Sequence, residues 1–96
     1  MIKRKIAWGN SFKRAYKKYI RRNLGLEKKL IDTLKLMEQD LFSPLLETHK
    51  LSGKLSGLHA SSCGYDCRIV FSIEKNVVYE EEIILLINIG SHHDVY

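Results

Sequence analysis

Residues that can move protons or bind a phosphate gather in the second half of the sequence. Asp66 and Arg68 are two positions apart at the start of an apolar run, so they project from the same face of a predicted strand. His49 precedes this run, and the sequence ends with a segment that contains His92 and Tyr96. Together they offer a cation for a phosphate, imidazoles that titrate near neutral pH, and a ring on which a base can stack.

This set of side chains suits the cleavage of RNA by its own 2′-hydroxyl group. The hydroxyl attacks the adjacent phosphate, so an enzyme needs only to position it, move protons and stabilise charge, and no cofactor is expected. Arg68 would stabilise the charge of the phosphorane, and His92 would act as the general acid or as the base. His49 or Asp66 would complete the proton-transfer pair, and Tyr96 would stack on the nucleotide or orient it.

Each of these residues also has an ordinary structural role. An Arg beside an Asp on a strand is more often a surface ion pair than a catalytic cation. Histidines in a C-terminal segment are more often solvated, and Tyr96 could cap the core. The functional interpretation therefore depends on the convergence of these residues rather than on any one of them.

The two cysteines allow further alternatives. With His59, His49 or His92, the thiolates of Cys63 and Cys67 are candidate zinc ligands, and Cys63 alone is a candidate nucleophile. Three intervening residues are not the spacing of a standard zinc knuckle, and Cys67 falls on the predicted core side of its strand. We therefore expect two reduced structural cysteines and no metal site.

The charge distribution indicates a polyanionic or acidic partner. The 96-residue chain has a net charge of +5 and a pI of about 9.3, basic residues crowd its first quarter, and residues 80–82 are all glutamate. Lys13, Lys17, Arg21 and Lys54 are the candidate RNA-binding cations, although the first three also fit the wet face of a helix.

Length and composition predict one domain, residues 1–96, in the cytoplasm. The chain is too short for a second core, and two cysteines are too few for a disulfide-rich secreted scaffold. No apolar run reaches transmembrane length and no signal-peptide core follows the basic start, so no membrane partner is expected.

The N-terminal part predicts a short strand followed by an αα-hairpin. Ile2, Ile6 and Trp8 alternate with basic residues, and Asn10 and Ser11 offer N-cap chemistry for a helix that continues to about residue 23. The apolar stripe of this helix consists of Phe12, Ala15, Tyr16, Tyr19 and Ile20.

Gly25 is typical of a helix C-terminus, and apolar residues at the helical period predict a second helix over residues 26–40. Pro44 marks its end, and the stretch up to Gly53 is expected to be irregular. Strands are predicted over residues 54–60, 66–74 and 82–89, with a turn at Lys75-Asn76. The fold class is therefore α+β: a short N-terminal strand, an αα-hairpin, and an antiparallel β-meander that forms one sheet.

Three segments of the second half resemble the RelE superfamily of bacterial type II toxins, most closely its YafQ-like branch. They are His49-Lys-Leu-Ser-Gly53-Lys-Leu-Ser-Gly57, Tyr65-Asp-Cys-Arg68-Ile-Val-Phe, and Ile89-Gly90-Ser-His92-His-Asp-Val-Tyr96. The resemblance covers essentially the whole chain in element order. It implies the RelE-like ribonuclease fold and a metal-independent, ribosome-associated mRNA endonuclease. It also implies a hetero-oligomer with a cognate antitoxin that silences the toxin.

The resemblance also assigns roles to individual positions. His49 matches a YafQ-like active-site histidine, and Asp66 matches an acidic catalytic residue. Arg68 matches a RelE-like arginine, His92 matches the residue expected to be the general acid, and Tyr96 matches the terminal aromatic residue. Lys54 lies in the neighbourhood of RelE-like lysines.

Three other positions depart from the branch, and two other functions remain open. Ser62 replaces a histidine, Cys67 a tryptophan and Asn88 an arginine of the YafQ-like pattern, which brings full activity into question. The alternatives are a ParE-like inhibitor of DNA gyrase and a catalytically degenerate antitoxin-binding protein. A binder has no chemical reason to keep His49, His92 and Tyr96, and RNA cleavage separates the three functions.

Overall fold

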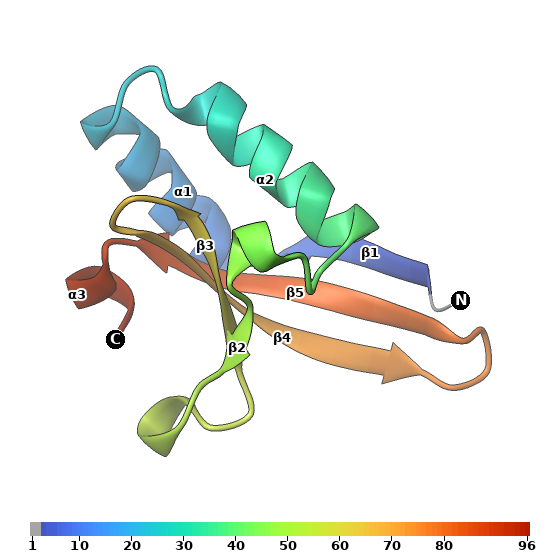
Figure 1. Ribbon diagram of the computed structural model, residues 1–96. Coiled ribbons are helices and arrows are strands. Elements are labelled where there is room, and N and C mark those ends of the chain that lie inside the picture. The colour runs from blue at the N-terminus through green and yellow to red at the C-terminus, as the bar shows by residue number, and fades with distance from the viewer. Residues whose placement is uncertain (1–2) are drawn as a thin grey trace.

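One five-stranded sheet with strand order β1-β5-β4-β3-β2 organises the chain (Figure 1). The computed structural model describes residues 3–96, so the predicted strand residue Ile2 lies outside the described part. The strands are β1 (Lys3–Trp8), β2 (His49–Lys50), β3 (His59–Gly64), β4 (Cys67–Asn76) and β5 (Glu81–Gly90). The helices are α1 (Asn10–Arg22), α2 (Glu27–Gln39) and α3 (His92–Val95), with 3₁₀ turns η1 (Pro44–Leu46) and η2 (Gly53–Leu55). None of the helices in residues 3–96 is long and apolar enough to cross a membrane.

Helices α1 and α2 form the predicted αα-hairpin and cover one face of the sheet (Figure 1). Their apolar stripes meet the core side of β4 and β5, and Gly25 provides a positive φ of 90° between the helices. The fully or almost fully buried side chains of this core include Phe12, Leu30, Met37, Ile69, Phe71, Ile84 and Leu86.

The predicted side-chain cap at Asn10 or Ser11 is wrong. The N-cap residue of α1 is Gly9, and no side chain caps the helix; the Ser11 hydroxyl instead donates to the carbonyl of Ile87, at 2.8 Å. The Gly9 amide donates to the carbonyl oxygen of Leu86 at 3.1 Å, and a Cβ on Gly9 would lie 2.7 Å from that oxygen. Backbone contact with β5 therefore fixes the start of α1.

The sheet is mixed. Strands β3, β4 and β5 form the predicted antiparallel meander, whereas β1 pairs with β5 in parallel. Across this parallel pair, Arg4 Nε lies 2.8 Å from Glu82 Oε1 and Lys5 Nζ lies 3.5 Å from Glu81 Oε1. The glutamates near the end of the sequence thus neutralise part of the basic N-terminal run.

Two predicted boundaries in the second half are wrong. Of the predicted strand 54–60, residues 54–58 are not a strand, because Gly53 and Gly57 have positive φ and bend this segment into a loop around η2. Strand β3 therefore begins only at His59. The β4–β5 turn is not at Lys75-Asn76 but at residues 77–80, where Asn76 Oδ1 accepts the amides of Val78 and Tyr79. The stretch expected to be irregular also contains the two-residue strand β2.

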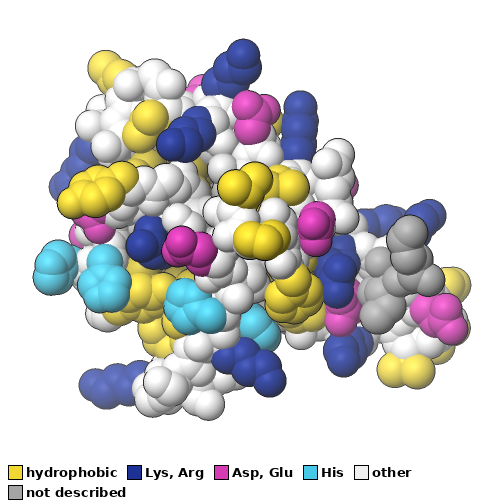
Figure 2. All heavy atoms as spheres, viewed as in Figure 1, with side chains coloured by type: hydrophobic (Ala, Val, Ile, Leu, Met, Phe, Trp, Pro, Cys, Tyr) yellow, Lys and Arg dark blue, Asp and Glu magenta, His cyan; other side chains and the backbone are white. Residues whose placement is uncertain are grey.

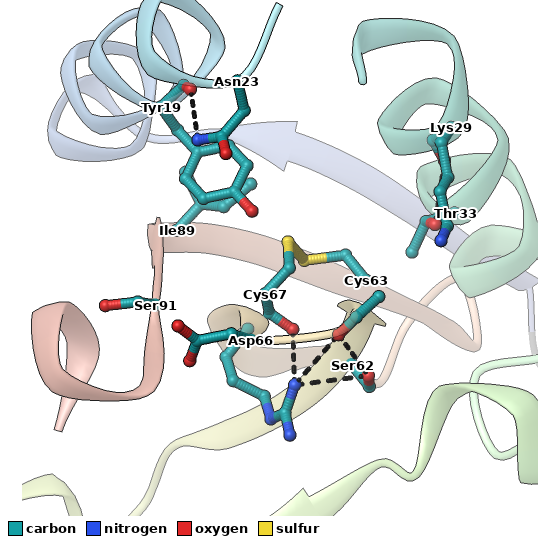
Figure 3. Close-up of a disulfide and its surroundings, with 12 residues drawn as sticks. Tyr19, Asn23, Lys29, Thr33, Ser62, Cys63, Asp66, Cys67, Ile89 and Ser91 are labelled. Carbon is teal, nitrogen blue, oxygen red and sulfur yellow. Dashed lines mark hydrogen bonds between the residues drawn. A yellow bond between two sulfur atoms is a disulfide. The ribbon is translucent and has the colours of Figure 1, made fainter. Parts of the chain in front are cut away.

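The expectation of two reduced cysteines is also wrong, because a disulfide joins Cys63 to Cys67 (Figure 3). Gly64 and Asp66 both have positive φ, at 132° and 51°, and this tight reversal brings the two cysteine Cα atoms to 5.0 Å. Both cysteines are buried beneath the helices. Because each sulfur is bonded to the other, neither is a thiolate ligand or a nucleophile in this structure. Among residues 3–96, no group of three or more His, Cys, Asp or Glu side chains is arranged so that it could hold a metal ion.

Reduction of this disulfide should lower the free energy of unfolding by about 2 kcal/mol, because a closed loop this short removes little entropy from the unfolded chain. Urea unfolding with and without dithiothreitol measures the difference. A Cys63→Ala, Cys67→Ala variant is the control and should unfold at the same urea concentration under both conditions. If the urea midpoint of the unaltered chain were the same with and without dithiothreitol, the disulfide would not form in solution.

Candidate active site

Two of the candidate residues, His49 and Arg68, lie on the sheet face opposite α1 and α2. Cross-strand register places His49, Ala60, Val70 and Asn88 in one row, and Ser62, Arg68 and Gly90 in the next. Directly paired residues of neighbouring strands project to the same face, and Ile69 and Phe71 point the other way into the core. The register therefore puts His49 and Arg68 on one surface although they are far apart in the sequence.

The β3–β4 turn holds Arg68 through three hydrogen bonds. Its Nη1 donates to the carbonyl oxygens of Cys67 at 2.8 Å and Gly64 at 3.2 Å, and to Ser62 Oγ at 3.4 Å. Within residues 3–96, Nε and Nη2 of Arg68 have no hydrogen-bond partner. The guanidinium is thus fixed at one nitrogen and keeps donors for an anion at the others.

The short helix α3 positions His92 and Tyr96. A capping box between Ser91 and Asp94 starts the helix, and its last residue, Val95, is buried. Asp66 Oδ1 accepts the backbone amide of His92 at 3.0 Å, which joins α3 to the β3–β4 turn. The His92 and Tyr96 rings meet edge to face with centroids 4.6 Å apart.

A groove next to Tyr96 brings in His49 and Lys54. It has a volume of about 450 Å³ and runs between β2, η2 and Tyr96. His49 Nδ1 lies 2.9 Å from the carbonyl oxygen of Glu47, so Nε2 remains for a substrate. Figure 2 shows histidine side chains in a band from α3 to β2, with lysine or arginine side chains around η2.

Tyr96 links the groove to the other candidate residues, because it lines the groove together with His49 and its ring meets that of His92. Arg68 is close enough to Tyr96 for its charge to oppose the raised pKa of that phenol, whose larger cause is burial. The raised pKa keeps the Tyr96 hydroxyl protonated at neutral pH, where it can donate a hydrogen bond. Asp66, in contrast, already uses one oxygen to hold α3, which favours a positioning role over proton transfer.

The predicted RNA-binding cations divide into two groups. Lys54 lies in the groove, and Lys50, which the sequence analysis did not single out, lines the same groove. Lys13, Lys17 and Arg21 instead line a separate hollow with Trp8, Tyr16 and Glu27. Lys18 and Arg22, which lie with Asp94 beside the start of α3, form a further basic face of α1. Their i, i+4 spacing in the sequence could have indicated this face.

All three positions that depart from the YafQ-like pattern make defined contacts in the structure. Ser62 accepts from Arg68, and Cys67 forms the disulfide and supplies a carbonyl to Arg68. Asn88 Oδ1 accepts the backbone amide of Ile89, beside the register shift in the β4–β5 pair. The site therefore pairs an imidazole on β2 and another on α3 with a cation on β4, an arrangement able to transfer protons and bind a phosphate.

Comparison with known proteins matches residues 4–96 to the family model described as a bacterial toxin of type II toxin–antitoxin systems, YafQ. No curated protein sequence matches the chain. Among solved structures, YafQ from Escherichia coli strain BL21(DE3) is 14% identical with a TM-score of 0.78, covering 97% of this chain and 98% of that one. The E. coli DinJ–YafQ toxin–antitoxin complex gives 15% identity, a TM-score of 0.72 and 99% coverage of both chains. A YoeB/ParE toxin from Agrobacterium tumefaciens gives 19% identity and a TM-score of 0.71, covering 92% of this chain and 98% of that one.

The pKa of His59, beside the groove, should lie below its ordinary value of 6.5. Burial is the largest cause, and the positive charges of Lys50 and His49 add to it. The unfolded imidazole takes its proton at about pH 6.5 and the folded one only at lower pH, so stability should fall as the pH drops through 6.5. NMR titration of the ring measures the midpoint, and Lys50→Gln should raise it without restoring 6.5. A midpoint above 6.5 would contradict this environment for His59.

Proposed function

The chain belongs to the YafQ family of bacterial toxins of type II toxin–antitoxin systems, and we propose that it is an endoribonuclease that cuts mRNA on the ribosome. The observation that carries the proposal is the set of neighbours around Tyr96. The His92 ring meets it edge to face, His49 lines the same groove, and the Arg68 guanidinium is near enough for its charge to act on the phenol. These groups supply what cleavage by a 2′-hydroxyl needs: two imidazoles, a cation and a protonated phenol.

In the proposed reaction, the ribose 2′-oxygen attacks the adjacent phosphorus and the bond to the 5′-oxygen of the next nucleotide breaks. The products are a 2′,3′-cyclic phosphate and a free 5′-hydroxyl. His49 takes the 2′-hydroxyl proton through Nε2, and His92 gives a proton to the leaving oxygen. We assign these roles because Asp66 already accepts the His92 amide, while His49 lines the groove and the His92 ring meets that of Tyr96, which lines the same groove.

Arg68 and Tyr96 act on the phosphate and the nucleotide. Nε and Nη2 of Arg68, which have no hydrogen-bond partner among residues 3–96, bind the non-bridging oxygens as negative charge develops. Tyr96 lies against the edge of His92 and is 43% exposed, so its ring can orient the imidazole and stack on a base at once. Lys54 and Lys50 add positive charge along the groove for the RNA backbone.

An antitoxin encoded with the toxin is the proposed partner, in a hetero-oligomer. The E. coli DinJ–YafQ complex supports this part of the proposal, as does the surplus of basic residues on α1 that an acidic partner would complement. We expect the antitoxin to cover Arg68, His92 and Tyr96. Since its substrate would be translated mRNA, the proposal places the chain in the cytoplasm.

Replacing His92 with Gln should lower mRNA cleavage by about 10²–10⁴-fold, because the general acid is lost. Arg68→Ala should lower it by about 10²–10³-fold through loss of charge stabilisation. The purified variants are added to a translating bacterial extract, and the 5′ ends of the mRNA are mapped. His93→Gln is the matched control, because both histidines are exposed on α3 but it is the His92 ring that meets Tyr96, so the cuts made by His93→Gln should equal those of the unaltered chain.

Circular dichroism establishes that every variant is folded. Intact mRNA with the unaltered chain would overturn the ribonuclease, and an assay of DNA supercoiling would then test inhibition of gyrase. Cuts that persist in His92→Gln, or that are lost equally in His93→Gln, would reject the assigned acid.

A further inference from the structure

A second hollow adjoins the candidate active site on the far side of Asp66. It lies between the C-terminal half of α1, the β3–β4 turn and the start of α3, and has a volume of about 460 Å³. Figure 3 shows Tyr19 and Asn23 of α1 on one side, across from Asp66 and Ser91. The lining residues used below are Lys18, Tyr19, Arg22, Tyr65, Asp66 and Asp94, and we call this region the Tyr65 hollow.

The two cations of the Tyr65 hollow form no ion pair in the described residues, whereas each of its two carboxylates accepts a backbone amide. Lys18 and Arg22 are one helical turn apart on α1, and neither forms an ion pair within 4.0 Å in residues 3–96. Asp94 accepts the backbone amide of Ser91, and Asp66 accepts that of His92. The pKa of Asp94 is lowered first by its bonds with Ser91 and then by the charges of Arg22 and Lys18. The hollow thus has room for an anion beside two cations.

The hollow also offers an aromatic ring and a neutral donor. Tyr65 is fully exposed, at 101% of its reference area, although it belongs to the five-residue loop that the disulfide closes. A ring held out on a constrained loop provides a stacking surface at little entropic cost. The pKa of the Tyr19 phenol is raised, mainly by burial, so its hydroxyl remains a donor at neutral pH.

Asp66 belongs both to the Tyr65 hollow, which it lines, and to the candidate active site, where it accepts the backbone amide of His92. We propose that the Tyr65 hollow is an RNA subsite that binds a nucleotide flanking the cleavage point, with its phosphate at Lys18 and Arg22 and its base on Tyr65. This inference depends on the proposed ribonuclease function. It makes α1 a contributor to substrate binding through a face other than the one that carries Lys13, Lys17 and Arg21.

The test is a binding measurement that needs no cleavage. A fluorescent single-stranded RNA oligonucleotide with 2′-O-methyl groups cannot react, and anisotropy measures its dissociation constant. Lys18→Gln, Arg22→Gln should weaken binding about tenfold and should lower the salt dependence by about 0.7 for each lost phosphate contact. Lys28→Gln, Lys35→Gln is the matched control, with the same charge loss on the exposed face of α2, and should bind within about twofold of the unaltered chain.

A second pair of variants tests the aromatic ring. Tyr65→Ala should weaken binding about tenfold through loss of stacking, whereas Tyr79→Ala, which removes another exposed tyrosine from the β4–β5 turn, should not. Both tyrosines are solvent-exposed, so neither variant endangers the core.

The outcomes separate this inference from the ribonuclease itself. Equal weakening by the α1 and α2 pairs would show general charge attraction and overturn the subsite, as would failure of the unaltered chain to bind the oligonucleotide. If Lys18→Gln, Arg22→Gln bound an acidic antitoxin peptide more weakly but bound RNA as the unaltered chain does, the hollow would be assigned to the antitoxin. That result would also overturn the proposed RNA subsite. Cleavage by the unaltered chain in the translating extract is scored separately, so the function can stand while the subsite fails.

Discussion

The hydrogen bond from the His92 amide to Asp66 joins α3 to the β3–β4 turn, at the end of the β4–β5 pair where Arg68 lies opposite Gly90. Asp66 can reach that amide because its backbone is left-handed, at φ 51°, and because the disulfide between Cys63 and Cys67 closes the loop around it. The same turn presents the carbonyls of Gly64 and Cys67 to Arg68. One constrained reversal thus fixes the cation of the site and places the helix that carries its imidazole and phenol. Ser62 and Cys67, which depart from the YafQ-like pattern, are part of this constrained turn, since both accept hydrogen bonds from Arg68.

Electrostatics divides the basic first quarter of the chain into parts with different tasks. Arg4 and Lys5 are paired with Glu82 and Glu81 across the parallel strands, and Arg4 also lies 5.4 Å from the centroid of the Phe42 ring. These charges therefore stabilise the edge of the sheet more than they attract a partner. The remaining cations lie on α1, where the helical period distributes them over two different hollows. A count of net charge cannot make this distinction, because it depends on which residues face which element.

The sequence predicted the parts of the fold that depend on local periodicity. The αα-hairpin and the last two strands follow from apolar spacing, and their burial agrees with it. What failed depends on backbone geometry and on contacts between distant segments. The cap of α1 comes from Leu86 on β5, the loop before His59 from two glycines with positive φ, and the disulfide from the reversal at Gly64 and Asp66. Among the candidate site residues, the five proposed catalytic positions stand out in the sequence because they are chemically unusual, whereas Lys18 and Arg22 look like any solvated helix face until Tyr65 is placed beside them.

The strand order has a consequence for how the chain is made. The strand with partners on both sides that comes last in the sequence is β5, which pairs with β1 and β4. A chain emerging from the ribosome exposes β1, α1 and α2 first, but their apolar faces and the free edge of β1 have to wait for residues 81–90. The residues that follow, on α3, then bring His92 and Tyr96 to Arg68. During vectorial synthesis a new copy therefore cannot assemble its site until residues 81–96 have emerged from the exit tunnel. Until then, the uncovered strands are the part of the nascent chain that most needs a chaperone or a partner.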